Sequence, residues 1–167
     1  MRVVVLADTH IRPRSIGDGD APRLPPPLTH ALQGADAILH AGDVVAADLL
    51  DELAAFAPVH AVLGNNDHGL EDALPETLEL ELDGVDVAMV HDSGQRRGRA
   101  ARMKRRFPDA AIVVYGHSHM PEDALGEGGQ RLFNPGSPTQ RRRAPTRTYG
   151  VLDLSSGRVC RHRIVSL

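Results

Sequence analysis

The sequence predicts an α/β fold in which two mixed β-sheets are covered by helices. Short apolar runs alternate with helix-like segments in the first third of the chain, as parallel strands and their crossovers require. Antiparallel hairpin patterns follow in the middle and at the end of the chain. The length of 167 residues fits one domain, residues 1–167, that folds without disulfides or a structural metal.

Apolar runs predict the strands, and segments flanked by turn residues predict the helices. The expected strands span residues 3–7, 37–41, 59–63, 77–82, 85–90, 110–115, 131–133, 148–154 and 158–165. The expected helices span residues 28–33, 46–56 and 98–107, and residues 13–27 and 72–75 are expected to be loops. Asp83-Gly84 and residues 155–157 are turn sequences that join two hairpins.

The composition excludes several classes of protein. The chain has 19 Lys and Arg against 22 Asp and Glu, a net charge of −3, which disfavours a basic nucleic-acid binder. Aromatic residues make up only 3%, which argues against a stacking platform for single strands. The single cysteine, Cys160, excludes an internal disulfide, and we expect it to be a small core residue. No run approaches the length of a membrane span or a signal sequence, so we expect a cytoplasmic protein without membrane contact.

Five of the predicted strands end in a polar cluster. The clusters are Asp8-Thr9-His10, Gly42-Asp43, Gly64-Asn65-Asn66-Asp67, His91-Asp92 and Gly116-His117-Ser118-His119. Residues two apart in an extended chain point the same way, so we expect Asp8 to point with His10, and His117 with His119. The glycines allow sharp turns and close approach of the backbone. In open α/β sheets, residues beyond the carboxyl ends of the strands build the functional site.

These clusters offer only oxygen and nitrogen donors. One cluster means little, because a lone histidine at a strand end is more often a hydrogen-bonded polar residue than a metal ligand. Five clusters are difficult to explain by packing, because buried ionisable groups destabilise a protein unless they are paired or bind a metal. The donor set suits a pair of divalent cations with Asp43 as a shared carboxylate.

The clusters and their order resemble the motifs of the calcineurin-like metallophosphoesterases, especially the small bacterial and archaeal phosphodiesterases. The family pattern is D-x-H, G-D, G-N-x-D, a single His and G-H-x-H, and all five blocks stand between Asp8 and His119. The segment Asn134-Pro135-Gly136-Ser137 and the final hairpin extend the resemblance over essentially the whole chain. The resemblance implies a four-layer α/β/β/α sandwich. It also implies hydrolysis of a phosphate ester, and specifically of a phosphodiester, by a hydroxide that bridges two metal ions.

The resemblance also implies the metal ligands. Asp8, His10 and His119 would hold one ion, Asn65, His91 and His117 would hold the other, and Asp43 would be shared. Oxygen and imidazole donors accept Mn²⁺, Ni²⁺, Fe²⁺, Co²⁺ and Zn²⁺, and we expect Mn²⁺ first. Two such ions, two carboxylates and one hydroxide leave a net charge of about +1, which attracts a phosphate anion. No serine or cysteine nucleophile is required.

One position departs from many family members, which have histidine in the variable place of G-N-x-D. Asn66 stands there, and asparagine donates hydrogen bonds but cannot act as an acid. We therefore expect a small phosphodiester with a good leaving group, aryl or nucleotide-like, rather than an alkyl monoester. His68 is either a substitute acid or a surface residue.

Further polar residues have alternative interpretations. The candidate substrate contacts are Asn65, Asn66, His91 and Arg141. Arg141 belongs to the run 141–143, which is either a phosphate clamp or part of a solvated loop. The basic residues of 96–106 are expected to form a solvated helix face. Asp67 and Asp92 either orient a ligand histidine or cap a turn, and His40 and His60 are expected either to be structural or to support the metal ligands from behind.

Three functions are compatible with the sequence. The first is a metal-dependent phosphodiesterase. The second is a non-catalytic interaction scaffold, because the eukaryotic retromer subunit resembles these enzymes and binds protein partners. The complete set of seven donors favours the enzyme over the scaffold. The third is a regulator that senses Mn²⁺ or a similar ion. An exposed edge strand could also pair with a second copy and form a homo-oligomer.

Overall fold

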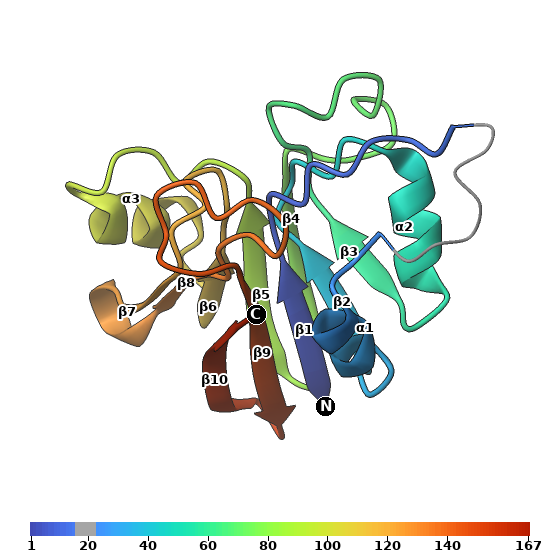
Figure 1. The fold of residues 1–167 in the computed structure, drawn as a ribbon. Coiled ribbons are helices and arrows are strands. Elements are labelled where there is room, and N and C mark those ends of the chain that lie inside the picture. The colour runs from blue at the N-terminus through green and yellow to red at the C-terminus, as the bar shows by residue number, and fades with distance from the viewer. Residues whose placement is uncertain (16–22) are drawn as a thin grey trace.

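Two five-stranded β-sheets pack face to face in the computed structural model, which describes residues 1–15 and 23–167 (Figure 1). The strand order is β10-β9-β1-β2-β3 in the first sheet and β4-β5-β6-β8-β7 in the second. Both sheets contain parallel and antiparallel pairs. The predicted α/β fold with two mixed sheets is confirmed.

The elements of each layer come from separate parts of the chain. The first sheet consists of β1 (Arg2–Leu6), β2 (Ala37–His40), β3 (Val59–Ala61), β9 (Thr148–Ser155) and β10 (Arg158–Ser166). The second sheet consists of β4 (Thr77–Leu82), β5 (Val85–Val90), β6 (Ile112–Val114), β7 (Glu122–Leu125) and β8 (Arg131–Asn134). The helices are α1 (Pro26–Leu32), α2 (Ala47–Ala54) and α3 (Arg99–Arg106), with a 3₁₀ turn at Glu127–Gly129.

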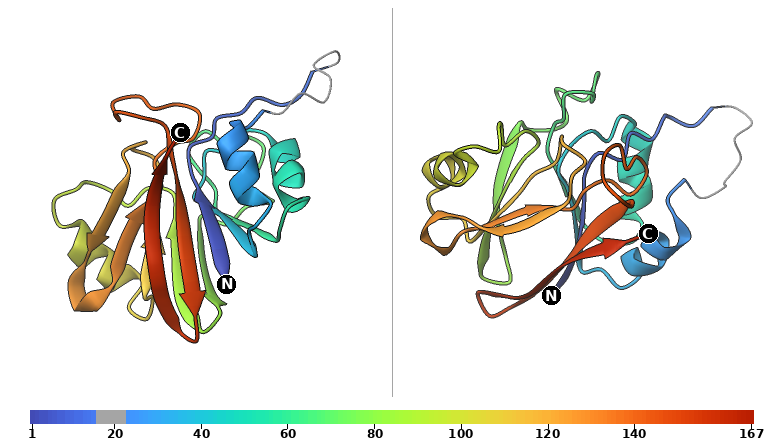
Figure 2. Two further views of the ribbon diagram at one scale, coloured as in Figure 1. Left: turned by 60° about the horizontal axis from the view of Figure 1, so that its bottom comes forward. Right: turned by 60° about the vertical axis from the view of Figure 1, so that its left-hand side comes forward.

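Helices cover the outer face of each sheet and complete a four-layer α/β/β/α sandwich (Figure 2). Leu28 of α1 and Leu49 of α2 pack against the first sheet, and Met103 of α3 packs against the second. On β1, Val5 faces the core between the sheets while Leu6 faces the helices. Burial on both faces explains why β1 reads as a continuous apolar run.

The predicted elements are present, and their bounds differ from the predictions by at most two residues. The strand β7 is not predicted by the sequence, because Glu122–Leu125 is an acidic, half-exposed edge strand without the usual strand composition. The helix α1 begins at Pro26, inside the predicted loop 13–27, because proline is tolerated in the first turn of a helix. Residues 16–22 of that predicted loop lie outside the described residues.

Cys160 is exposed, so the prediction that it is a small core residue is wrong. It lies on the edge strand β10, where the pairing with β9 shifts register between Val159 and Arg161. The irregularity interrupts the in-out alternation on which the prediction depended. In the part of the chain that the structure describes, no helix is long and apolar enough to cross a membrane.

Candidate metal centre

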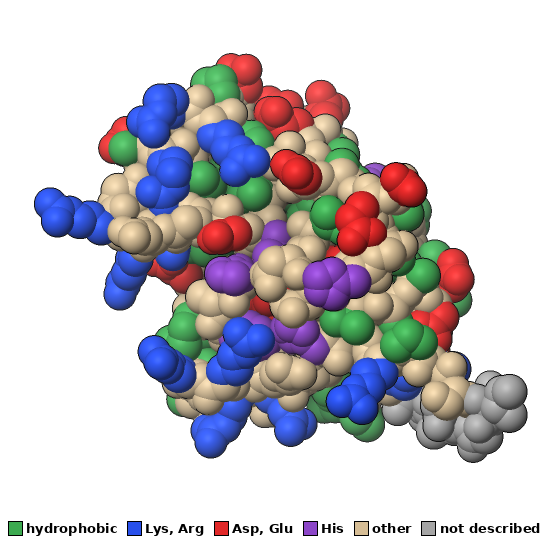
Figure 3. Space-filling model, turned by 90° about the horizontal axis from the view of Figure 1, so that it is seen from above, with side chains coloured by type: hydrophobic (Ala, Val, Ile, Leu, Met, Phe, Trp, Pro, Cys, Tyr) green, Lys and Arg blue, Asp and Glu red, His purple; other side chains and the backbone are tan. Residues whose placement is uncertain are grey.

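The five polar clusters meet beyond the carboxyl ends of parallel strands, as the sequence predicts. Residues that follow β1, β2 and β3 come from the first sheet, and residues that follow β5 and β6 come from the second. Figure 3 shows this face from above, with histidine side chains gathered near its middle. Seven side chains converge there: Asp8, His10, Asp43, Asn65, His91, His117 and His119.

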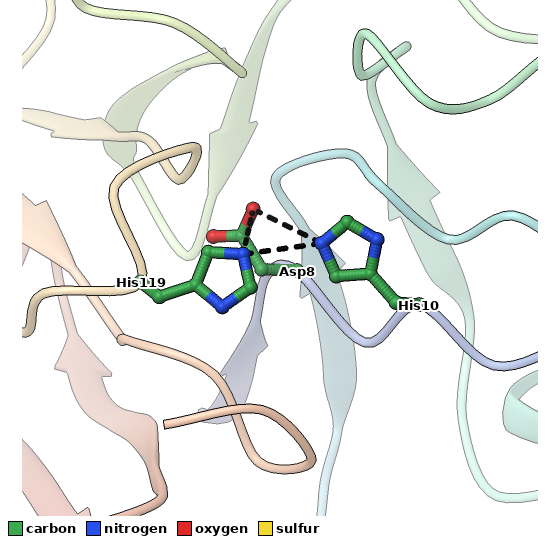
Figure 4. Close-up of side chains that lie close together, drawn as sticks. All are labelled: Asp8, His10 and His119. Atoms are coloured by element: carbon green, nitrogen blue, oxygen red, sulfur yellow. Dashed lines mark hydrogen bonds and ion pairs between the residues drawn. The ribbon is translucent and has the colours of Figure 1, made fainter. Parts of the chain in front are cut away.

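Asp8, His10 and His119 form one donor group, which we call the closed group (Figure 4). His10 Nε2 lies 3.1 Å from His119 Nε2, and the two rings are stacked. Asp8 Oδ1 lies 3.5 Å from His119 Nε2 and 4.0 Å from His10 Nε2. The Asp8 and His119 side chains are 0% exposed, so this group is almost shut off from water.

Asn65, His91 and His117 form a second donor group, which we call the open group. Asn65 Oδ1 lies 3.1 Å from His91 Nε2 and 2.8 Å from His117 Nδ1. His91 is buried, but Asn65 and His117 are exposed. The open group therefore faces solvent.

Asp43 lies between the two groups. Its Oδ2 is 3.4 Å from His10 Nε2 and 3.4 Å from His91 Nε2. One carboxylate oxygen thus faces an imidazole nitrogen of each group. Asp43 is therefore placed where it could contact a cation held by either group.

Backbone carbonyls orient two of the imidazole rings. His119 Nδ1 donates to the carbonyl of Gln140 at 2.8 Å, and His91 Nδ1 donates to the carbonyl of Ala41 at 2.7 Å. The Nε2 atom of each ring is therefore the one that points into the centre. Burial, with the nearby positive charge of Arg142, lowers the pKa of His119 to about 4, so this ring is neutral at pH 7 and its Nε2 offers a lone pair.

The two carboxylates differ in how they titrate. Burial raises the pKa of Asp8 to about 7, and Asp8 Oδ2 is buried with no hydrogen-bond partner among the described residues. Burial also acts to raise the pKa of Asp43, but the interaction with His91 and the hydrogen bonds from Asn66 outweigh it and hold that pKa well below its ordinary value. A buried carboxylate oxygen without a donor, on a side chain whose other oxygen lies 3.5 Å from His119 Nε2, fits a divalent cation as its missing partner.

Strained backbone marks the ligand positions. Asp8, His10, Asp43, His117 and His119 all have φ between 46° and 67°. Residues other than glycine rarely adopt this left-handed conformation, which costs about 1–3 kcal/mol each and is concentrated at functional sites. Because the backbone is not extended here, the prediction that His117 points the same way as His119 is wrong, whereas Asp8 and His10 do point into one group, as predicted. His117 points into the open group and His119 into the closed group, while Asp8 and His10 converge through two left-handed residues.

Asp67 ties together the loops that carry Asp43 and Asn65. Its carboxylate accepts hydrogen bonds from the backbone N–H groups of Gly64 at 2.7 Å, Asp43 at 2.9 Å and Val45 at 2.7 Å. A side chain at Gly64 would overlap Asp43, so only glycine allows the two loops to approach this closely. Asp67 thus holds backbone rather than a ligand histidine.

Asp92 caps a turn and does not orient a ligand histidine, because its Oδ1 accepts a hydrogen bond from the Gly94 N–H at 2.7 Å. His40 is structural, as predicted. It is fully buried with Nε2 3.0 Å from Thr9 Oγ1, and burial lowers its pKa to about 3. His60 is half-buried on β3.

The segment that follows β8 braces the ligand loops. Ser137 Oγ donates to the carbonyl of Asp8 at 2.7 Å, and Asn134 Nδ2 donates to the carbonyl of Gly116 at 2.9 Å. Thr139 Oγ1 donates to the carbonyl of Thr9 at 2.5 Å. The sequence motif pointed to residues 134–137, but it did not reveal Thr139 or the Gln140 carbonyl, since backbone contacts of this kind leave no recognisable pattern.

Two of the predicted substrate contacts, Asn66 and Arg141, already make hydrogen bonds within the protein. Asn66 donates from Nδ2 to Asp43 Oδ2 at 2.7 Å and from its backbone N–H to Asp43 Oδ1 at 2.8 Å. His68 is exposed, and Arg141 Nη1 donates to the carbonyl of Pro145 at 3.1 Å. The roles of these residues as substrate contacts stay predictions.

Arg142 is a residue that the sequence did not single out within the run 141–143. Burial is the largest influence on the pKa values of Asp8, His10 and His119, and the positive charge of Arg142 also lowers all three. Arg142 itself is exposed and has a left-handed backbone, with φ of 45°. Arg142, rather than Arg141, is therefore the arginine whose charge acts on the closed group.

The basic helix face is only partly solvated. Arg105 and Arg106 are exposed, as predicted. Arg102, in contrast, donates from Nε to the carbonyl of Ser93 at 2.9 Å, and Arg99 pairs with Glu122. The prediction of a solvated face is wrong for these two residues, because they hold the loop after His91 and the edge strand β7.

Comparison with known proteins agrees with this fold and site. The family model of the calcineurin-like phosphoesterase superfamily domain matches residues 1–157. A protein described as a probable metallophosphoesterase of Methanothermobacter thermautotrophicus is 32% identical over 146 residues, which cover 83% of this chain and 78% of the relative.

Two solved structures show the same fold. Vps29 complexed with Zn²⁺ from Entamoeba histolytica has a TM-score of 0.73 at 24% identity and covers 99% of both chains. Yfce, a phosphoesterase from E. coli, has a TM-score of 0.59 at 20% identity and covers 98% of both chains. The resemblance that the sequence motifs predict is confirmed. The chain belongs to the calcineurin-like phosphoesterase superfamily.

Proposed function

We propose that this protein is a metal-dependent phosphodiesterase that uses two divalent cations. The observation that carries the proposal is the position of Asp43 Oδ2, which lies 3.4 Å from an imidazole nitrogen of the closed group and 3.4 Å from one of the open group. Three further donors flank it on each side. Mn²⁺ is our first candidate, and Ni²⁺, Fe²⁺, Co²⁺ and Zn²⁺ suit the same donors.

When bound, such cations acidify a water molecule and draw charge from a phosphoryl oxygen. The chain supplies the rigid frame for this chemistry. Asp67 holds the backbone of both loops around Asp43, and Asn66 fixes the Asp43 carboxylate from two directions. Because the donors are already oriented by hydrogen bonds, little reorganisation is needed when substrate arrives.

The substrate approaches from the open group. Asn65 and His117 are exposed there, whereas Asp8 and His119 are enclosed. Arg142 adds positive charge beside the site, and we propose that it helps to hold the phosphate. Asn65, Asn66, His91 and Arg141 remain further candidate contacts.

The leaving group should depart without help from a strong acid. Asn66 cannot donate a proton, and His68 is exposed. We therefore propose small phosphodiesters with good leaving groups, aryl or nucleotide-like, as substrates. His68 acting as the acid would instead allow poorer leaving groups.

Hydrolysis of bis(p-nitrophenyl) phosphate tests this proposal. We expect turnover that is abolished by a chelator, restored by Mn²⁺ or Ni²⁺, and faster than turnover of the monoester p-nitrophenyl phosphate. Absence of turnover with all five candidate metals would contradict the proposal.

The alternative is an interaction scaffold, because a vacuolar sorting protein, Vps29, shares the fold. Fold alone does not separate the two functions, and the complete donor set favours the enzyme. A stoichiometric protein partner recovered from a native extract, together with no turnover on a panel of diesters, would favour the scaffold.

A further inference from the structure

A cavity of about 420 Å³ lies beside the metal centre. This volume is within the range of about 300–1,000 Å³ that is typical of small-molecule sites and exceeds what a phosphate group alone would fill. The cavity is lined by Arg96, Arg99, Ser118, Met120, Pro121 and Glu122.

Two walls of the cavity continue the loops that carry metal-ligand candidates. Ser118 stands between His117 and His119, and Met120 and Pro121 follow directly. Arg96 lies on the loop between His91 and α3, which Arg102 holds through the carbonyls of Ser93 at 2.9 Å and Gln95 at 2.6 Å. A phosphate held at the centre therefore has this cavity next to it.

One wall is suited to a flat apolar group. Met120 is 41% exposed although it is a large apolar residue, and Pro121 adjoins it. The Arg96 side chain is 89% exposed, and its Nε lies 3.9 Å from Glu122 Oε1, too far for a hydrogen bond. A planar guanidinium that is not held by hydrogen-bond geometry can stack on an aromatic ring, and thioethers also make favourable contacts with rings.

The lining also contains a second arginine, Arg99, which several contacts hold in place. The Arg99 guanidinium lies 4.9 Å from the centroid of the Tyr115 ring and donates to Tyr115 Oη at 3.2 Å, while Glu122 accepts from both residues. Arg99 Nε is buried and has no hydrogen-bond partner in the described part of the chain. Two guanidinium groups against one carboxylate favour an anionic ligand.

We propose that this cavity binds one ester arm of a phosphodiester, and that this arm is a flat aromatic group. The inference rests on the proposed function, because it needs the phosphate to sit at the metal centre. The ring packs against Met120 and the Arg96 guanidinium. Aryl groups and nucleobases share this chemistry, and the experiment below distinguishes them.

Methionine methyl groups provide a direct readout that does not depend on turnover. The chain has 4 methionines, of which Met89 and Met103 are buried in the core and Met1 is at the N-terminus. In Zn²⁺-loaded protein labelled with ¹³C-methyl methionine, phenylphosphonate should shift the Met120 signal upfield through the ring current, and methylphosphonate should not. The M120L variant assigns the signal. A Met120 signal that phenylphosphonate leaves unmoved would overturn the proposal.

Thymidine 5′-monophosphate and phenyl phosphate, titrated in the same way, separate the two sources of the ring. A larger Met120 shift with the nucleotide at saturation assigns the cavity to a nucleobase, and a larger shift with phenyl phosphate assigns it to an aryl group. Either result supports an aromatic arm. Failure of both ligands to move the signal contradicts it.

Kinetics give a second, independent test. In the Arg96→Ala/Met120→Ser variant, the KM for bis(p-nitrophenyl) phosphate should rise about tenfold. Arg105→Ala, an exposed arginine of α3 outside the cavity, is the matched control and should leave KM unchanged. An unchanged KM in the double variant overturns the inference while leaving the proposed function intact. No turnover by the wild type with any of the metals overturns the proposed function.

Discussion

The closed and open donor groups are built from the same kinds of side chain but differ in their environment. The closed group of Asp8, His10 and His119 lies in the interior, and the segment between β8 and β9 braces it through Ser137 and the Gln140 carbonyl. In the open group, Asn65 and His117 are exposed, and only His91 is buried. Asp43 lies between them, with Oδ2 3.4 Å from an imidazole nitrogen of each group.

This difference predicts separate roles for the two groups in binding cations and in admitting substrate. A buried and braced set of donors is preorganised, so it should bind its cation more tightly and exchange it more slowly. An exposed set leaves room for a substrate to reach the cation beside it.

Breaking the link between the groups should have the largest effect. Asp43→Asn removes the shared negative charge, and we expect phosphodiesterase activity to fall on the order of 10³-fold, with no more than one ion bound. Metal analysis of the purified variant, together with turnover of bis(p-nitrophenyl) phosphate, checks both effects. Asp86→Asn, an exposed aspartate at the far end of β5, is the matched control. Wild-type turnover with two ions bound to Asp43→Asn would show that Asp43 is not shared.

Loosening the loops around Asp43 should have the next largest effect. Asp67→Asn replaces a carboxylate that accepts three backbone hydrogen bonds, and we expect metal affinity to fall about 10–100-fold. Calorimetric titration with Mn²⁺ should show that the weaker of two binding steps suffers more, because Asp67 touches no residue of the closed group in the described structure. Asp72→Asn, exposed in the same segment, should bind like the wild type. Equal losses in both steps would contradict the contrast between the groups.

The sequence predicts the composition of the site better than its geometry. The apolar runs that end in Asp8, Asp43 and His117 predict which residues converge, because parallel strands deliver their carboxyl ends to one edge. The directions of the side chains were not predictable, since they depend on left-handed backbone at the ligands themselves. Long-range braces, such as the Gln140 carbonyl on His119, also escaped prediction because any residue supplies a carbonyl.

The fold shows the same limit. Strands buried on both faces, such as β1, have a strong apolar signal and were predicted. The acidic edge strand β7 has no such signal in its composition. It forms a strand because it pairs with β8, and that pairing cannot be read from the local sequence. The predicted burial of Cys160 is wrong because the register shift beside it depends on pairing with the neighbouring strand and not on the local sequence.

Charge beside the closed group should affect substrate binding moderately. Arg142→Ala should raise the KM for the diester about tenfold and leave metal content unchanged, since a lost charge-assisted contact costs about 1.5–3 kcal/mol at most. Arg143→Ala provides the comparison, because it is an exposed neighbour in the same loop. Equal KM values in the two variants would assign no special part to Arg142.

The smallest effect on activity at neutral pH concerns His40, which supports Thr9 behind the closed group. Burial lowers the pKa of His40 from 6.5 to about 3. Between pH 6.5 and pH 3, His40 is therefore protonated in the unfolded chain and neutral in the folded protein. The contribution of His40 to the free energy of unfolding should therefore decrease as pH falls, by about 2 kcal/mol between pH 7 and pH 5. Denaturant unfolding of metal-free wild type and His40→Gln isolates this contribution, because the variant should lose less stability over the same interval. Equal losses would show that His40 is not the titrating group.

The central claim is that both donor groups bind cations and that Asp43 belongs to each. Anomalous diffraction from crystals soaked in Mn²⁺ tests it most directly. We predict two peaks about 3.5–4 Å apart, one on each side of Asp43, with the peak in the closed group filling first as the concentration rises. A single peak at saturating Mn²⁺, or peaks that do not contact Asp43, would contradict the account.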